Sequence, residues 1–314
     1  MTMRIVSTYR PGPVAARALP RAGLVGGGRA EAAWWGDRSL DALTSLLAGG
    51  RVVVLSGAGL STESGIPDYR GPSGVARRHT PMTIQAFTGD ALARRRYWAR
   101  SHLGWRLIAR AAPNAGHRAV ARLQHAGLVD AVITQNVDGL HGAAGSAPVV
   151  ELHGRLDEVT CLDCGNLTSR EEVDRRLREA NPDFVAQVDA VNPDGDVDLP
   201  DEQVAGFRPV DCGICQTGML KPDVVFFGET VPPQRVARCF DLVEQARALV
   251  VLGSSLTVMS GRRFVIRAAK NGIPVAIVNQ GPTRGDGYAT VCVDAPLGVV
   301  LPALADRVAA GAWV

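Results

Sequence analysis

Four cysteines are spaced as metal ligands. Cys161 and Cys164 form one C-x-x-C pair, and Cys212 and Cys215 form a second. Two such pairs suit Zn²⁺ in tetrahedral coordination, because four thiolates complete the coordination sphere and leave no open position. The long separation between the pairs predicts a helical insert between them. The pattern therefore predicts one structural zinc ion in preference to disulfides.

A glycine-rich segment follows a short apolar run. Residues 57–59 come directly after the run at 51–56, and glycines at the end of a strand let the backbone approach a pyrophosphate. The dinucleotide fingerprint is incomplete, since Thr62 replaces its third glycine, so a tight turn without a ligand is an equal alternative. Further along, Asp68 and Arg70 add a carboxylate and a guanidinium, and the guanidinium is suited to phosphate.

Polar side chains follow two further predicted strands. Asn136 and Asp138 come after the run at 129–134, where they could hold ribose hydroxyls and an amide, although N-x-D-G is also a common turn. His153 follows the next predicted strand, and an imidazole there can act as a general base near neutral pH. A structural hydrogen bond is the alternative for His153. His141 is a second candidate that the residues alone do not exclude.

The elements that must position these residues alternate between strands and helices. A predicted helix begins near Ser39 and ends before Gly49. Short β-branched runs predict strands at residues 51–56, 129–134, 149–152, 224–227, 248–252, 275–279 and 291–294. Helical patterns lie at residues 117–126, 234–246 and 261–271. This alternation predicts an α/β fold with a Rossmann-like parallel sheet and helices on both faces.

Two segments interrupt the alternation. Residues 72–112 have a helical pattern, and residues 155–220 contain the cysteine pairs. We assign these two insertions to a smaller zinc-binding and helical domain. The Rossmann-like domain then comprises residues 39–71, 113–154 and 221–314.

Composition indicates an ordinary globular protein, with 46% hydrophobic and 21% charged residues. Residues 1–38 carry six arginines and two acidic residues, a net charge of +4, so the rest of the chain has a net charge of −1 within the total of +3. The rest of the chain is therefore not basic enough to bind nucleic acid directly by bulk charge. No apolar run approaches the roughly 20 residues that cross a membrane. We expect residues 1–38 to be a disordered or loosely attached leader, and a mitochondrial transit peptide is the alternative.

Taken together and in this order, the motifs resemble the sirtuin family of NAD-dependent protein deacylases, from about Ser39 to the C-terminus. Residues 97–100, 161–165, 193–197, 220–229 and 281–284 are most similar to the class II branch, which includes the mitochondrial lipoamidase/ADP-ribosyltransferase sirtuin of animals. The resemblance implies NAD as cosubstrate, one structural zinc ion, and acyl-lysine proteins or peptides as substrates.

The resemblance also implies roles for individual residues. His153 would be the general base, Asn136 a second catalytic residue, and Tyr69 a shield of the reacting ribose from water. NAD would contact Gly57, Ala58, Gly59, Ser61, Ile66, Pro67, Asp68, Tyr69, Arg70, Gln135, Asn136, Val137, Asp138, Gly253, Ser254, Ser255, Asn279, Gln280, Gly281 and Leu297. An extended substrate peptide would contact Val224, Val225, Phe226, Phe227, Gly228 and Leu256.

In the implied reaction, the acyl-lysine carbonyl oxygen attacks the ribose as nicotinamide leaves, and His153 then draws a proton from the ribose hydroxyls. The products are free lysine, nicotinamide and O-acyl-ADP-ribose. The alternatives are a protein mono-ADP-ribosyltransferase on the same scaffold and a non-catalytic zinc-bearing interaction module. The acyl preference and the protein targets stay open. We favour a monomer in the bacterial cytoplasm, or in the mitochondrial matrix if the leader is a transit peptide.

Overall fold

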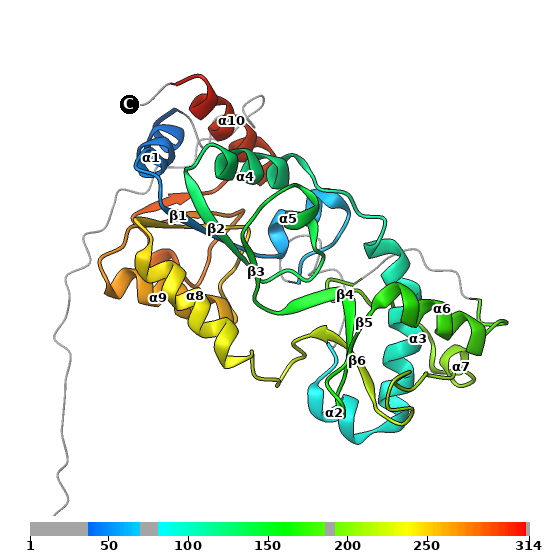
Figure 1. The fold of residues 1–314 in the computed structure, drawn as a ribbon. Helices are drawn as coiled ribbons and strands as arrows, with labels where there is room; N and C mark the ends of the chain where they lie inside the picture. Colours follow the sequence, from blue (N-terminus) through cyan, green and yellow to red (C-terminus); the bar gives the residue numbers. More distant parts are fainter. Residues whose placement is uncertain (1–36, 70–80, 186–191, 312–314) are drawn as a thin grey trace, which may run out of the picture. The chain divides into compact units, whose positions relative to one another are not determined.

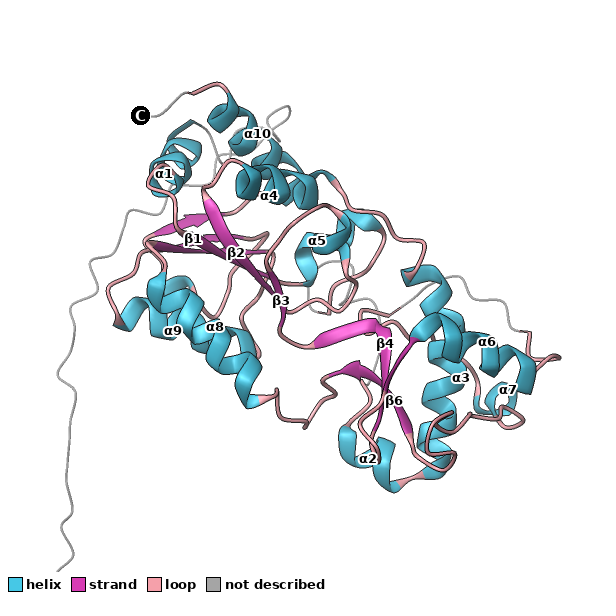
Figure 2. Cartoon of the chain, viewed as in Figure 1, coloured by secondary structure: helices cyan, strands magenta, loops and turns pink. Residues whose placement is uncertain are grey.

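The structure, a computed structural model, describes residues 37–69, 81–185 and 192–311, all within the unit of residues 34–314. Apart from residues 37 and 38, the predicted leader lies outside the described residues, and so does Arg70. Figure 1 follows the elements along the chain, and Figure 2 separates helices from strands. None of the described helices is long and apolar enough to cross a membrane.

A six-stranded parallel sheet has the strand order β3-β2-β1-β7-β8-β9. Its strands are β1 (Val52–Ser56), β2 (Val129–Thr134), β3 (Val149–Glu151), β7 (Ala248–Leu252), β8 (Val275–Val278) and β9 (Val291–Val293). The predicted parallel sheet is therefore confirmed. The early strands lie on one side of β1 and the late strands on the other, so β1 and β7 meet at the switch point where open α/β sheets bind ligands.

Helices cover both faces of this sheet, as predicted (Figure 1). One face carries α1 (Asp37–Leu47), α4 (Ala115–His125) and α10 (Leu297–Ala309), the other carries α8 (Pro233–Gln245) and α9 (Met259–Lys270), and the short α5 (Leu140–Ala143) follows β2. Because side chains alternate along a strand, β1 sends Val52 and Val54 into one core and Val53 and Leu55 into the other. Burial on both sides holds the carboxyl ends of the strands in place.

A second sheet is antiparallel and has the order β5-β4-β6. Its strands are β4 (Gly154–Cys161), β5 (Leu167–Ser169) and β6 (Leu220–Val224), and its associated helices are α2 (Ile84–Gly89), α3 (Ala91–Ile108), α6 (Arg170–Ala180) and α7 (Asp201–Val204). We call these elements the small domain. The helical pattern within residues 72–112 and the helical insert between Cys164 and Cys212 are both confirmed.

One predicted strand is wrong. We expected residues 224–227 in the parallel sheet, but β6 ends at Val224 and pairs antiparallel with β4. The prediction followed the apolar residues 224–227, but the strand that pairs with β4 is residues 220–224. Lys221 and Pro222 hid this strand, because a lysine is rarely buried and a proline lacks the N–H of a strand residue. Proline is tolerated there because β6 is an edge strand. This pairing crosses the predicted domain boundary between residues 220 and 221, and the boundaries themselves stay a prediction.

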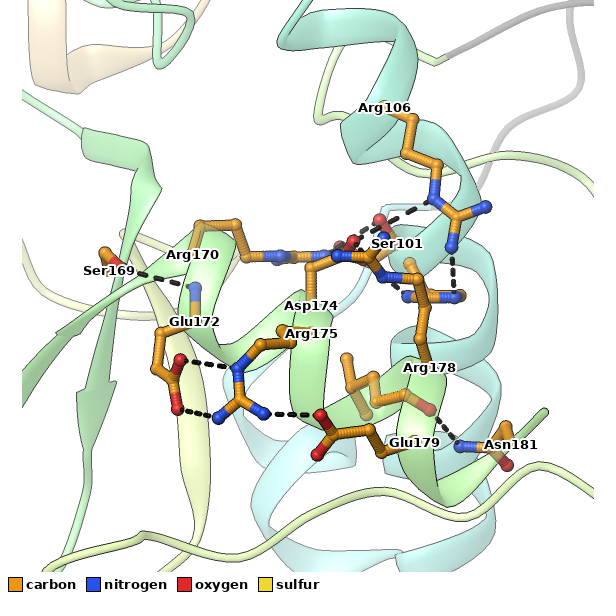
Figure 3. Close-up of polar contacts among 12 residues, drawn as sticks. Ser101, Arg106, Ser169, Arg170, Glu172, Asp174, Arg175, Arg178, Glu179 and Asn181 are labelled. Carbon is orange, nitrogen blue, oxygen red and sulfur yellow. Dashed lines mark hydrogen bonds and ion pairs between the residues drawn. The ribbon is translucent and has the colours of Figure 1, made fainter.

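A charged network joins α3 to α6 inside the small domain (Figure 3). Arg170 is fully buried; its guanidinium lies 4.9 Å from the centre of the Trp98 ring and donates to the Ser101 carbonyl at 2.8 Å. The Nδ1 of His102 lies 2.6 Å from Oδ1 of Asp174. Burial disfavours the Asp174 carboxylate, yet the hydrogen bond from His102 and the nearby arginines hold its pKa below the ordinary value.

The four predicted zinc ligands lie together, with their sulfur atoms all within 4.8 Å of one another. The Sγ atoms of Cys161 and Cys215 are 3.7 Å apart, and those of Cys164 and Cys212 are 3.8 Å apart. A tetrahedral zinc ion with Zn–S bonds of about 2.3 Å separates its ligands by about 3.8 Å. Gly218 leaves them room, because a Cβ there would lie 2.3 Å from the sulfur of Cys161. The cluster therefore fits one structural zinc ion.

Replacing Asp174 with Asn should destabilise the protein by about 2 kcal/mol near neutral pH, because it removes a largely buried carboxylate that is bonded to His102 and lies near Arg178. The pKa of Asp174 is depressed on folding, so its contribution is present above the unfolded pKa and is lost as the pH falls through the folded pKa. Urea unfolding across a pH series measures this. Glu179→Gln removes an exposed carboxylate from the same helix and should cost less than about 1 kcal/mol. Equal losses for the two variants would contradict the assignment.

Removing one zinc ligand should abolish zinc binding and lower the free energy of unfolding of the small domain. Structural zinc contributes roughly 10 kcal/mol to the folding of zinc-finger peptides, so Cys212→Ser should bind little zinc and unfold at a clearly lower temperature. Elemental analysis and thermal unfolding measure the two effects. Cys292→Ser, which changes an exposed cysteine outside the cluster, is the matched control. Full zinc content in Cys212→Ser would rule the site out.

Candidate functional site

A cavity of about 1460 Å³ lies at the carboxyl edge of the parallel sheet. Its wall combines the loops that follow β1, β2, β7 and β8 with Val224, the last residue of β6, and residues 225–231 after it. Every predicted NAD-contact residue that the structure describes lines this cavity, and so do His153 and the six predicted peptide-contact residues. The fold thus brings together residues from distant parts of the chain, while Arg70 falls outside the described residues.

Residues 57–59 form a glycine turn after β1. Glycine is needed in this turn because its backbone packs directly on the backbone of Gly253. The N–H of Gly59 donates to the carbonyl of Gly253 at 2.9 Å, and a Cβ on Gly59 would also lie 2.9 Å from that oxygen. Gly253 has a φ of +60°, in the left-handed region that favours glycine. The turn continues into two short 3₁₀ helices, η1 (Ala58–Leu60) and η2 (Thr62–Ser64). The N–H groups of Gly57, Gly59 and Leu60 donate to backbone carbonyls of the protein, so within this part of the described chain the Ala58 N–H is the one left for a phosphate oxygen.

A chain of hydrogen bonds joins the loop after β1 to the loop after β2. The Oγ of Ser61 donates to Oδ2 of Asp138 at 2.6 Å. The Nδ2 of Asn136 donates to the Oγ of Ser61 at 3.0 Å and to the carbonyl of Gly57 at 3.2 Å. These polar groups are held in place before any ligand arrives. With the glycine turn beside them, they fit a dinucleotide.

His153 has a hydrogen-bond partner at each ring nitrogen. Its Nδ1 lies 2.9 Å from the carbonyl of Gln135, and its Nε2 lies 2.8 Å from the Oγ of Ser260. A carbonyl oxygen only accepts, so Nδ1 carries the hydrogen and Nε2 is the basic nitrogen of the neutral ring. Burial lowers the pKa of His153, and the charges of Arg235 and Arg263 add to that effect. Both effects favour the neutral ring, the form in which an imidazole can accept a proton.

His141, the second histidine candidate, does not line the cavity. It is buried, with its Nε2 2.8 Å from the Oγ of Ser56 and its ring edge-on to His117. Burial lowers the pKa of His141 to about 3. His141 therefore has the position of a structural hydrogen-bonding residue.

The predicted peptide edge is partly occupied by the chain itself. The N–H groups of Val225, Phe226 and Phe227 donate, respectively, to the His153 carbonyl, the Glu229 carboxylate and the Met82 carbonyl. Within the described residues, the Val225 carbonyl and the Gly228 N–H have no hydrogen-bond partner. These two groups are the ones that an incoming backbone can use without displacing an existing bond.

An ion pair between buried Lys221 and partly exposed Glu229 shapes this edge. The ammonium of Lys221 lies 3.2 Å from the Glu229 carboxylate, donates to the Val224 carbonyl at 2.6 Å, and lies 4.8 Å from the centre of the Phe226 ring. The same carboxylate oxygen accepts the Phe226 N–H at 2.8 Å. The turn after β6 is therefore held by charge as well as by packing.

Sequence reasoning missed several residues that line the cavity. Ser260 and Arg263 come from the first turn of α9, and Tyr97, Ile108 and Leu156 come from the small domain. Ser260 could have been considered, because it follows the Gly253–Leu256 motif closely. The small-domain side chains carried no comparable signal, since apolar residues at helical spacing indicate core.

Comparison with known proteins agrees with this geometry. The Sir2 family model matches residues 57–260. The chain is 61% identical to NAD-dependent protein deacetylase 1 of Streptomyces coelicolor, over 87% of this chain and 91% of that protein. It is 52% identical to NAD-dependent protein deacetylase 1 of Mycobacterium avium, over 84% of this chain and 94% of that protein.

Solved structures give the same result. A structure described as a Sir2–p53 peptide–NAD⁺ complex is 31% identical to this chain and covers 87% of it and 98% of the other chain, with a TM-score of 0.67. A structure from work on the mechanism and regulation of Sir2 enzymes is also 31% identical, covering 87% of this chain and 99% of the other, with a TM-score of 0.69. With the family match spanning most of the fold and the cavity at its expected place, this chain belongs to the Sir2 family.

Proposed function

We propose that this chain is an NAD-dependent protein-lysine deacylase that releases nicotinamide and O-acyl-ADP-ribose. The observation that carries the proposal is the position of His153, whose imidazole lines the same cavity as the glycine turn and has one nitrogen bonded to the backbone. A relative at 61% identity that is named an NAD-dependent protein deacetylase supports it. NAD, when bound, supplies an ADP-ribosyl group to accept the acyl group.

The loops of the parallel sheet hold NAD in this proposal. Residues 57–59 would hold the pyrophosphate, with the Ala58 N–H as a donor that no protein carbonyl uses within the described residues. Arg70 is assigned to the pyrophosphate from the sequence. The adenosine half lies along residues 253–255 and 279–281. The nicotinamide end lies near Asp68 and Asp138, where Asn136 is already oriented by its hydrogen bonds to the glycine turn.

The substrate lysine enters along residues 225–228, opposite Leu256. The Val225 carbonyl accepts a backbone N–H of the substrate, and the Gly228 N–H donates to a substrate carbonyl. Recognition through main-chain groups tolerates varied protein sequences. His153 takes the proton from a ribose hydroxyl at Nε2, since Nδ1 is committed to the Gln135 carbonyl.

The acyl group extends towards the small domain. On that side Met82, Tyr97, Ile108, Leu156 and Pro193 give the cavity wall apolar surface, and Asp194 adds one carboxylate. Such a wall suits chains longer than acetyl, while class II membership and the acyl preference stay predictions. A panel of acetyl-, lipoyl- and branched dicarboxylic acyl-lysine peptides, assayed with NAD, ranks them. A preference for acetyl over every longer chain would contradict this assignment of the apolar end.

A second candidate function is protein mono-ADP-ribosyltransfer, because it uses the same NAD site. Mass spectrometry separates the two functions: deacylation yields O-acyl-ADP-ribose, whereas ADP-ribosyltransfer yields a modified protein. A non-catalytic interaction module would release no nicotinamide with any acyl peptide. We place the enzyme in the bacterial cytoplasm as a monomer that binds neither nucleic acid nor membrane directly.

Replacing His153 with Ala should reduce deacylation by about 10²- to 10⁴-fold, the range expected for loss of a general base. The measurement is the rate of O-acyl-ADP-ribose formation from NAD and an acyl-lysine peptide, by mass spectrometry. His125→Ala changes an exposed histidine on α4 and should leave the rate unchanged. Circular dichroism checks that both variants fold. Deacylation by His153→Ala at the rate of the unmodified protein would remove the proposed base.

A further inference from the structure

We infer that Ser260 is a positioning residue for His153, holding the imidazole so that its basic nitrogen stays at the cavity wall. The inference rests on the proposed role of His153 as the base. Its starting observation is the 2.8 Å contact between the Oγ of Ser260 and the Nε2 of His153. Both side chains line the cavity and both are partly buried.

The direction of this hydrogen bond follows from the other side of the ring. Nδ1 lies 2.9 Å from the Gln135 carbonyl and must donate to it, so Nε2 of the neutral ring has a lone pair and no hydrogen. The Ser260 hydroxyl is therefore the donor. With both nitrogens engaged, the ring cannot turn Nε2 away from the cavity without breaking two hydrogen bonds.

Ser260 lies on a helix that packs closely against Gln135, the other residue bonded to the His153 ring. It is the second residue of α9, and the next residue, Gly261, faces the Gln135 side chain. A Cβ on Gly261 would lie 2.4 Å from Oε1 of Gln135. Gln135 is held in turn, because its Nε2 donates to the Oγ of Ser254 at 2.8 Å. The two groups that orient His153 thus belong to elements in direct contact.

No other described side chain contacts Nε2 of His153 through a hydrogen bond. Arg235 of α8 and Arg263 of α9 act on the ring through their charge alone. Positioning of the basic nitrogen therefore depends on the Ser260 hydroxyl before substrate binds. When the ribose arrives, its hydroxyl meets a ring that is already aligned, and only the hydrogen bond of Ser260 has to yield.

The test compares Ser260→Ala with Ser260→Thr, which keeps a hydroxyl. We expect Ser260→Ala to lower kcat for deacylation by roughly 2- to 10-fold, the effect of one neutral hydrogen bond, with little change in the KM for NAD. Ser260→Thr should recover kcat to within about twofold. A kcat for Ser260→Ala equal to or above that of the unmodified protein would overturn the inference, and so would a loss shared equally by the two variants.

A spectroscopic measurement separates positioning from a general structural effect. In protein carrying ¹⁵N-histidine, above the pKa of His153, loss of the donor should move the Nε2 resonance of His153 downfield, while Ser260→Thr leaves it in place. Thr257→Val removes a hydroxyl from the same turn, one bonded to Ser255, and should not move that resonance. An unmoved resonance in Ser260→Ala would refute the contact in solution.

The same resonance distinguishes this inference from the proposed function. If the Nε2 resonance moves in Ser260→Ala but the unmodified protein turns over no acyl peptide, the hydrogen bond exists and the deacylase proposal fails. If peptides are turned over normally by Ser260→Ala, the deacylase proposal stands and the role of Ser260 fails.

Discussion

The structure depends on one close approach, between the turn after β1 and the loop after β7. The N–H of Gly59 meets the carbonyl of Gly253 at 2.9 Å, a contact in which no side chain takes part. Neighbouring strands at a switch point bring these loops together, and glycine removes the Cβ atoms that would push them apart. At this point the two loops that line the cavity meet through backbone alone.

A second constraint lies where the chain leaves the parallel sheet. Gly154 has a φ of +86°, and a Cβ there would lie 1.8 Å from the Asp223 carbonyl oxygen. The chain can therefore turn sharply after His153 and enter β4, while the His153 carbonyl accepts the Val225 N–H at 2.8 Å. The base, the peptide edge and the small domain consequently share one short stretch of backbone. A bulkier residue at position 154 would displace all three.

Much of the site could be predicted because its functional residues belong to short sequence motifs. The two cysteine pairs, the glycine turn and His153 all belong to this class. Residue types alone did not decide between His141 and His153, since both follow predicted strands and the direction of the side chain separates them. The resemblance to the sirtuin family assigned the base to His153. Ser260 was missed because it lies 107 residues from its partner. Residues 224–227 were misplaced because a buried lysine and a proline precede them in the real strand.

The burial of Lys221 limits how far the protein can itself be acylated on lysine. The sequence contains only one other lysine, Lys270, which is exposed at the end of α9. Lys221 has its ammonium group committed to the turn after β6 and a side chain only 4% exposed. On its own folded surface the protein thus offers a single lysine amine to spontaneous acylation.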